Sequence, residues 1–143
     1  MTTNRNHRKE NLAAWLLRLD SVAHILAAVV VFLPQETIAQ LHERLGLGVF
    51  PDSPIAWYLA RGLSAYYAMH GTFVLILSFH IRRYLRLVRL LVRLFAAYGL
   101  LMVFVDLQAA MPTWWVIAEP AFILVFSATV LMLLADSTSE SDG

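Results

Sequence analysis

Three charged residues, Arg61, Asp106 and Glu119, lie within or at the ends of long apolar stretches. A charge inside a membrane segment is costly, so each one is a functional hypothesis by default. One guanidinium and two carboxylates at a similar depth predict an ion cluster, with Arg61 paired to Glu119 and Asp106 nearby. Such a cluster either holds two helices together or forms a polar pocket that binds an anionic or polar headgroup through Arg61.

Two histidines, His24 and His70, fall near the middle of two different apolar stretches. Imidazoles from two helices are typical ligands of haem iron, and they also bind transition metals. Asp20 precedes His24 by four residues, so it lies on the same helical face and can orient the ring. The alternative to haem is a histidine that is hydrogen-bonded to a tyrosine or to a backbone carbonyl.

The helical face that carries Arg61 is rich in small residues, which allow transmembrane helices to approach closely. These residues are Ser64, Ala65, Ala68 and Thr72, with Gly71 at the edge of the face. His70 follows Arg61 by nine residues and therefore lies on the opposite face. We expect the Arg61 face to pack inward and His70 to face lipid, a bound ligand or a partner.

A second ion pair is predicted toward the other end of the spans, between Asp20 and Arg93, with Arg89 as an alternative cation. Its expected role is structural. Arg18 and Arg86 can extend their side chains to the headgroups. The simplest explanation of this basic layer is membrane topology and attraction to anionic lipids.

Cysteine and several common catalytic motifs are absent from the sequence. No cysteine is present, which excludes disulfides, iron–sulfur clusters and cysteine-ligated zinc. No phosphate-binding glycine loop, HExxH motif or nucleophile elbow occurs. We predict no catalytic residue, no metal and no cofactor, with haem on His24 and His70 as the alternative. Only Glu119, Asp106 and His70 are candidates for acid–base chemistry.

The composition indicates a membrane protein. Of the 143 residues, 59% are apolar and 15% are charged, and the mean hydropathy is +0.65. Soluble domains average about 45–50% apolar and about 25% charged. A soluble chain of this size could not hide so much apolar surface, because small domains keep much of their surface exposed. So little soluble surface also argues against a nucleic-acid partner.

The apolar stretches predict an all-α fold, an integral membrane four-helix bundle. Each stretch is near or above the roughly 20 residues that cross a bilayer. The four spans are expected at about 12–33, 55–79, 85–105 and 113–135. A short amphipathic helix at about 35–46 is expected to lie in the interface between spans one and two. The single domain, 12–135, follows a basic leader, 1–11, and precedes a disordered cytoplasmic tail, 136–143.

Several residues mark the expected ends of these helices. Asn11 is suited to cap the first span, and Pro34 to end it. Gly46 is expected to end the amphipathic helix. The pair Ser53–Pro54 is typical of a helix start, with proline in the first turn.

The distribution of basic residues predicts the orientation, because cytoplasmic loops carry an excess of Lys and Arg. The leader and the second loop are basic, whereas the other two connections contain only Arg44. The basic residues concerned are Arg5, Arg8, Lys9, Arg82, Arg83, Arg86 and Arg89. Both termini are therefore expected in the cytoplasm.

Short motifs resemble those of the small four-span bacterial membrane proteins called DoxX-like. The motifs are Tyr58-Leu59-Ala60-Arg61, Asp106 with Met111-Pro112-Thr113-Trp114-Trp115, and Glu119-Pro120. The similarity covers roughly residues 16–134. It implies a compact four-helix bundle in the bacterial cytoplasmic membrane, and the family often resembles accessory subunits of membrane complexes.

Two functions from different classes follow. The first is a non-enzymatic bundle that binds a lipid or small amphipathic molecule, or an accessory subunit with a membrane-protein partner or a second copy as its neighbour. Its polar centre would be Arg61, Asp106 and Glu119. The second is a membrane redox or isomerase-type enzyme with an intramembrane site at His24 and His70 or at Glu119.

Overall fold

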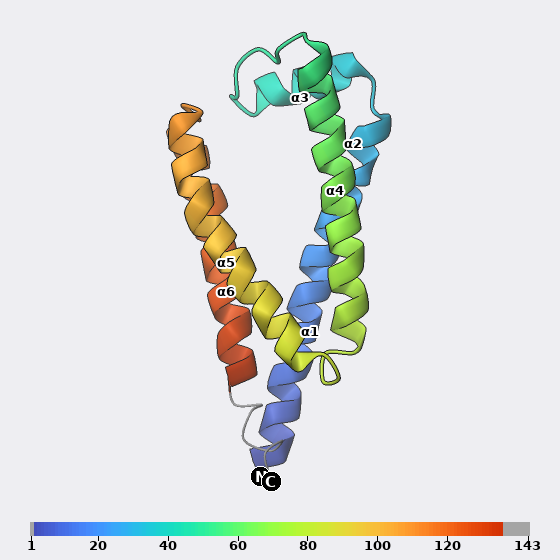
Figure 1. Cartoon of the computed structure of the whole chain (residues 1–143), viewed down its shortest axis with the longest axis vertical. Coiled ribbons are helices and arrows are strands. Elements are labelled where there is room, and N and C mark those ends of the chain that lie inside the picture. The colour runs from blue at the N-terminus through green and yellow to red at the C-terminus, as the bar shows by residue number, and fades with distance from the viewer. Residues whose placement is uncertain (1, 136–143) are drawn as a thin grey trace. The chain divides into compact units, whose positions relative to one another are not determined.

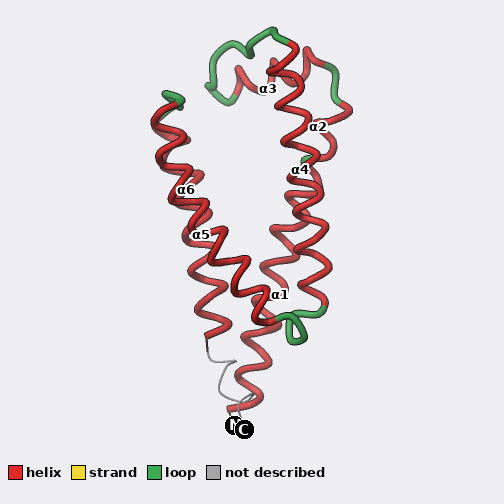
Figure 2. The backbone as a smooth tube through the Cα atoms, in the orientation of Figure 1, coloured by secondary structure: helices red, strands yellow, loops and turns green. Residues whose placement is uncertain are grey.

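The computed structural model describes the backbone of residues 2–135 and the side chains of residues 6–135. Its regular elements are all α-helices, joined by short turns and loops. No strand occurs in this part (Figure 2). The predicted tail, 136–143, lies outside the described residues. The helices, labelled in Figure 1, are α1 Thr2–Leu26, α2 Ala28–Phe32, α3 Gln35–Arg44, α4 Pro54–Phe79, α5 Leu85–Gln108 and α6 Thr113–Leu134.

Four helical stretches are long and apolar enough to cross a membrane, judged by length and composition. They are Asn6–Phe32, Pro54–Phe79, Leu85–Gln108 and Thr113–Leu134. The all-α fold class with four candidate spans is therefore confirmed, as is a short helix, α3, between the first two spans. These features indicate a multi-pass membrane protein.

The first helix begins earlier than predicted, because α1 includes the polar leader from Thr2 onward. Asn11 is an interior residue of this helix and not its cap. Polar residues such as Arg, Lys and Glu are good helix formers, so nothing in the leader ends the helix. Pro34 ends the first span as predicted: Leu33 is extended, the conformation that a following proline favours.

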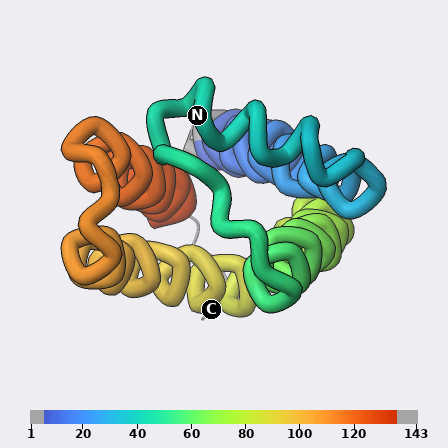
Figure 3. The backbone as a smooth tube through the Cα atoms, turned by 90° about the horizontal axis from the view of Figure 1, so that it is seen from above, coloured from blue at the N-terminus to red at the C-terminus, as the bar shows by residue number. Residues whose placement is uncertain are grey.

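Two other helix ends also agree with their sequence signals. Ala56 donates its backbone N–H to the Ser53 hydroxyl at 3.2 Å, which caps the start of α4 ahead of Pro54. Gly46 follows α3 with φ of 73°, the left-handed conformation that glycine adopts at low cost. α3 runs across the direction of α4 and not along it (Figures 1 and 3).

The chain divides into two compact units, which we describe separately. The terminal unit comprises Met1–Leu17 and Leu77–Gly143, and the central unit comprises Arg18–Ile76. The prediction of one domain, 12–135, stays a prediction.

In the terminal unit, α5 and α6 pack side by side (Figure 1). The buried residues of α6 recur at intervals of three and four, which places them on one face. They are Pro120, Ile123, Ser127, Val130 and Leu134. Opposite them, a Cβ added to Gly99 would lie 2.7 Å from the Ile123 Cγ2 atom. The absence of a side chain at Gly99 therefore allows the close contact between the two helices.

In the central unit, α4 is turned differently from the prediction. Its buried face carries Ser64, Gly71 and Val74, whereas Ala65 and Thr72 are exposed. A Cβ added to Gly71 would lie 2.7 Å from both the His24 Cβ and the Ser21 carbonyl oxygen. This close contact determines which face of α4 is buried. At 100° per residue, that face lies about a quarter turn around the helix from Arg61.

Candidate functional site

Two carboxylates within electrostatic range of each other lie toward the end of the terminal unit where α5 ends and α6 begins. Asp106 is only 3% exposed, and its Oδ2 atom is buried without a hydrogen-bond partner. Glu119, on α6, lies within electrostatic range of Asp106. Its Oε2 atom accepts a hydrogen bond from the Trp115 indole N–H at 2.6 Å. We call Asp106 and Glu119 the carboxylate pair.

The described part of the terminal unit places no basic residue near this pair. Its Lys, Arg and His residues all lie in 5–9 and 80–93, and α6 contains none. Arg93 is 13 residues before Asp106, which is about 20 Å along a helix that rises 1.5 Å per residue. The carboxylate pair is therefore not neutralised within the described residues of its own unit.

A tight turn fixes the position of Asp106. The Met111 N–H donates to the Asp106 backbone carbonyl at 3.0 Å, and the Ala110 N–H donates to the Leu107 carbonyl at 3.2 Å. Ala110 has φ of 52°, in the left-handed region. Asp106 thus lies in the last turn of α5, where the helix dipole disfavours a negative charge. Its burial there has a cost that the turn does not offset.

An open apolar groove of about 450 Å³ runs along α6 close to Glu119 in sequence. It is lined by Leu16, Ala121, Phe122, Val125, Phe126 and Thr129. All six residues belong to the terminal unit. The unit therefore combines a buried acidic pair with an apolar groove on the same helix as Glu119.

Arg61 is half-buried in the central unit, where it contacts the end of the first span. Its Nη2 atom donates to the Leu33 carbonyl at 3.2 Å, while its Nε atom is buried without a partner. Leu33 is the C-cap of α2, and a cation there is favoured by the helix dipole. The predicted pairing of Arg61 with Glu119 would join the two units, so it stays a prediction.

The central unit brings the two midplane histidines together. The rings of His24 and His70 meet edge to face, with centroids 5.7 Å apart, and Tyr67 contacts His24 at the same distance. The His24 Nδ1 atom lies 2.9 Å from the Asp20 carbonyl and 3.4 Å from the Asp20 carboxylate. Asp20 thus contacts His24 as their spacing predicts. His70, expected to face lipid, a bound ligand or a partner, instead contacts the His24 ring of its own unit, because the buried face of α4 is turned toward it.

This packing bears on the haem alternative for His24 and His70. Iron and porphyrin would have to lie between the two rings, which are in contact, and α1 and α4 also touch at Gly71. The helices would therefore have to separate to admit the group. The described residues contain no set of three or more His, Cys, Asp or Glu side chains suited to a metal ion.

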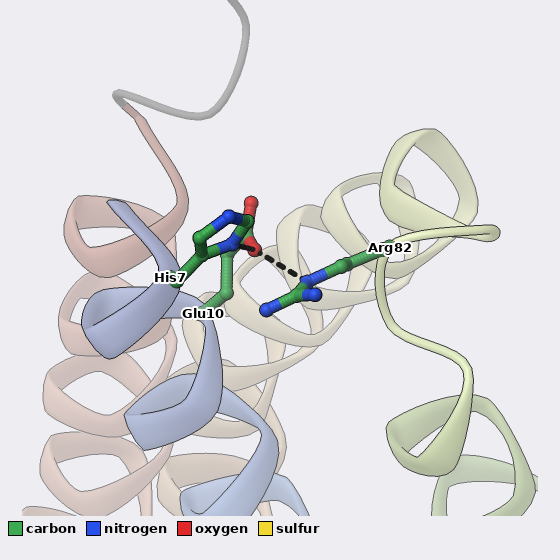
Figure 4. Close-up of polar contacts among 3 residues, drawn as sticks. All are labelled: His7, Glu10 and Arg82. Atoms are coloured by element: carbon green, nitrogen blue, oxygen red, sulfur yellow. Dashed lines mark hydrogen bonds and ion pairs between the residues drawn. The ribbon is translucent and has the colours of Figure 1, made fainter. Parts of the chain in front are cut away.

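The other end of the terminal unit has a complete ion cluster, which the sequence analysis missed. Glu10 is 8% exposed, and its Oε2 atom accepts from the Arg82 Nε–H at 2.9 Å, with the His7 Nδ1 atom at 3.5 Å (Figure 4). The signal was present: Ala13, Ala14 and Leu17 follow Glu10 at spacings of three, four and seven, and all are buried.

Arg93, the predicted partner of Asp20, is exposed on α5. The two residues belong to different units, so their pairing stays a prediction. Arg89 instead donates to the Leu134 carbonyl at the end of α6.

Comparison of the chain with protein-family models, with curated proteins and with solved structures finds no match in any of the three. The fold and composition define the class, a multi-pass membrane protein.

Proposed function

We propose that the protein is a non-enzymatic membrane protein that binds a lipid or small amphipathic molecule at the carboxylate pair. The observation that carries the proposal is the Asp106 side chain, which is 3% exposed with an unpartnered Oδ2 atom beside Glu119. A buried charge is costly unless it is paired and hydrogen-bonded. The missing partner is therefore a group from outside the described terminal unit.

The chemistry of the pair and its surroundings defines the ligand. Two carboxylates accept hydrogen bonds, so the polar end of the molecule donates hydrogen bonds or carries positive charge. The apolar groove along α6 suits an alkyl chain, because its lining includes Phe122, Val125 and Phe126.

An accessory role in a membrane complex is the second form of the same proposal. In that form, a polar group of a partner protein, or of a second copy of this chain, completes the pair. The resemblance to DoxX-like proteins supports this form, and the location that we propose from it is a bacterial cytoplasmic membrane.

Native mass spectrometry of the protein, purified in a mild detergent, tests the proposal. We expect the wild type to retain a bound molecule that Asp106→Asn and Glu119→Gln lose. Glu43→Gln is the matched control, because Glu43 is an exposed carboxylate on α3. Retention of a second protein chain in the same pattern supports the accessory form. Identical adducts on all four proteins would overturn the proposal.

The proposed orientation places the basic residues 7–9 and 80–93 in the cytoplasm. Because the chain has no cysteine, single-cysteine variants can be labelled without a background. A membrane-impermeant maleimide on intact cells should label Glu43→Cys, and should label Arg83→Cys only after permeabilisation. The reverse pattern would mean that the orientation is inverted.

An intramembrane enzyme is the second candidate function, favoured by the contact between His24 and His70 and by Asp20 beside His24. Ionisable residues grouped inside a membrane are typical of redox or proton-transfer sites. An ultraviolet–visible spectrum of the oxidised and the reduced protein tests the redox form. A Soret band that shifts on reduction supports haem at these histidines, and a spectrum with only tryptophan and tyrosine absorption removes it. For an acid–base enzyme, Glu119→Gln would abolish turnover and leave the fold intact.

A further inference from the structure

Three arginines near the start of α5, Arg86, Arg89 and Arg93, have different environments in the structure. Arg89 is half-buried and donates to the Leu134 carbonyl. Arg86 and Arg93 are exposed. Glu10 is the acidic residue of the described terminal unit at this end, and it already contacts Arg82 and His7. Two of the three guanidinium groups are thus exposed, and the structure shows no acidic side chain paired with them among the described residues of their own unit.

The exposed face of α5 that carries Arg86 and Arg93 becomes apolar farther along the helix. At 100° per residue, Arg86 and Arg93 lie within about 20° of each other. The exposed apolar side chains that share this side of the helix are Leu90, Leu100, Leu101 and Phe104. The face therefore presents two cations at one end and an apolar surface over the rest, the arrangement that complements an anionic phospholipid.

The length of an arginine side chain allows the Arg93 guanidinium to reach toward the level of Arg86. Arg93 lies eight residues after Leu85, the first residue of α5, which is about 12 Å along the axis. Side chains on a helix are tilted toward its N-terminus, so Arg93 extends back toward Arg86. A long arginine side chain in an apolar setting places its guanidinium at headgroup depth. Both groups can then contact the same headgroup region.

We propose that Arg86 and Arg93 bind the phosphate of an anionic phospholipid whose acyl chain lies along Leu90, Leu101 and Phe104. The occupant belongs to the membrane leaflet at the basic end of α5. This site is separate from the carboxylate pair, so its test does not depend on whether the proposed function is correct.

The test is a lipid titration of the full chain in mild detergent, followed by native mass spectrometry with phosphatidylglycerol and with phosphatidylcholine. A basic residue near an anionic surface contributes about 1 kcal/mol, which is a factor of about five in affinity. Arg86→Gln and Arg93→Gln should therefore each weaken phosphatidylglycerol binding about fivefold, and the double variant about 25-fold. Phosphatidylcholine binding should not change.

Arg83→Gln is the matched control, because it removes the same charge from an exposed arginine beside the Tyr84 ring, outside α5. We expect it to have a much smaller effect than either α5 variant. An equal effect would show attraction by net charge alone and would overturn the proposal. Equal affinity of the wild type for the two lipids would also overturn it.

Two further variants keep the test decisive if the glutamine variants fold poorly. Leu90→Glu places a carboxylate between Arg86 and Arg93 on the same face and retains both arginines. It should abolish the preference for phosphatidylglycerol, and a retained preference would contradict the proposal. Asp20→Asn should leave phosphatidylglycerol binding unchanged. An increase would mean that Asp20 holds Arg93, and the site would then be wrong.

Discussion

Glu10 and Asp106 are both buried carboxylates of the terminal unit, at 8% and 3% exposure, but their surroundings differ. Glu10 contacts Arg82 and His7, which come from the same unit. Asp106 has an unpartnered oxygen and a second carboxylate, Glu119, for a neighbour. The described residues of the terminal unit therefore complete the charge of Glu10 but not that of Asp106.

The difference identifies which charge is structural. A buried charge that loses its only partner destabilises the fold, whereas replacing an uncompensated charge with a neutral group removes a cost. Residues kept in an unfavourable setting are typical of functional sites, where stability is given up for binding. Glu10 thus holds the helices together, and Asp106 is the candidate for binding.

The largest expected effect on stability comes from disrupting the packing of α5 against α6 in the terminal unit. In Gly99→Leu the new side chain would overlap the Ile123 Cγ2 atom, which a Cβ alone would approach to 2.7 Å. Overpacking of this kind costs about 3 kcal/mol, measured by thermal unfolding in detergent. Gly62→Leu is the control, because nothing lies within 4 Å of a Cβ added there. Equal losses in the two variants would mean that α5 and α6 are not closely packed at Gly99.

A double-mutant cycle on Arg61 and Glu119 tests whether Arg61 is the outside partner. We expect Arg61→Ala and Glu119→Ala each to lower stability. The double variant should lose less than their sum, by about 2 kcal/mol, as found for residues in direct contact. Chemical unfolding in mixed micelles gives the three free energies. Additive losses of stability would mean that Arg61 and Glu119 do not interact. Both Asp106 and Glu119 would then be available to a ligand.

A substitution in the cluster of Glu10, Arg82 and His7 should cause a smaller loss of stability. Glu10→Gln removes the charge that Arg82 and His7 contact, and we expect a loss of about 1 kcal/mol. The value is modest because the Arg82 side chain is 56% exposed and water screens the pair. Thermal unfolding at low and high salt measures it, and the difference from the wild type should shrink at high salt. A gain in stability would place Glu10 in the same class as Asp106.

The smallest effect concerns the turn that positions Asp106. Ala110 has φ of 52°, a conformation that costs an L-residue about 1–2 kcal/mol and glycine almost nothing. Glycine has a more flexible unfolded state, which offsets part of the gain. Ala110→Gly should therefore stabilise the protein by about 0.5 kcal/mol, read as a small rise in Tm. Ala109→Gly, at the ordinary helical C-cap, should not stabilise it.

Hydropathy and end signals predicted most of the fold. The spans follow from the length of the apolar stretches, and Ser53, Pro34 and Gly46 mark helix ends for local reasons of hydrogen bonding and backbone conformation. Which face of α4 is buried could not be predicted from the sequence, because small residues occupy two adjacent faces of this helix. Only the close contact of Gly71 with His24 and Ser21 shows which face is buried.

The candidate site was predictable in part. The similar depth of Asp106 and Glu119 predicts that they lie near each other, and the charge of Asp106 acts on Glu119 in the structure. The role of Glu10 was missed, because a charged residue in a basic leader gives no sign of burial unless the apolar residues after it are examined for helical spacing. The contact between His24 and His70 depends on the rotation of α4, which the sequence does not determine.

The central claim is that Asp106 lacks a partner within its own unit, and the stability of delipidated Asp106→Asn tests it most directly. Removing the uncompensated charge should raise the free energy of unfolding by about 1–3 kcal/mol relative to the delipidated wild type. This sign is opposite to the one expected for Glu10→Gln. A loss of stability in Asp106→Asn would mean that the chain itself completes the Asp106 charge, and the proposed binding site would have to be abandoned.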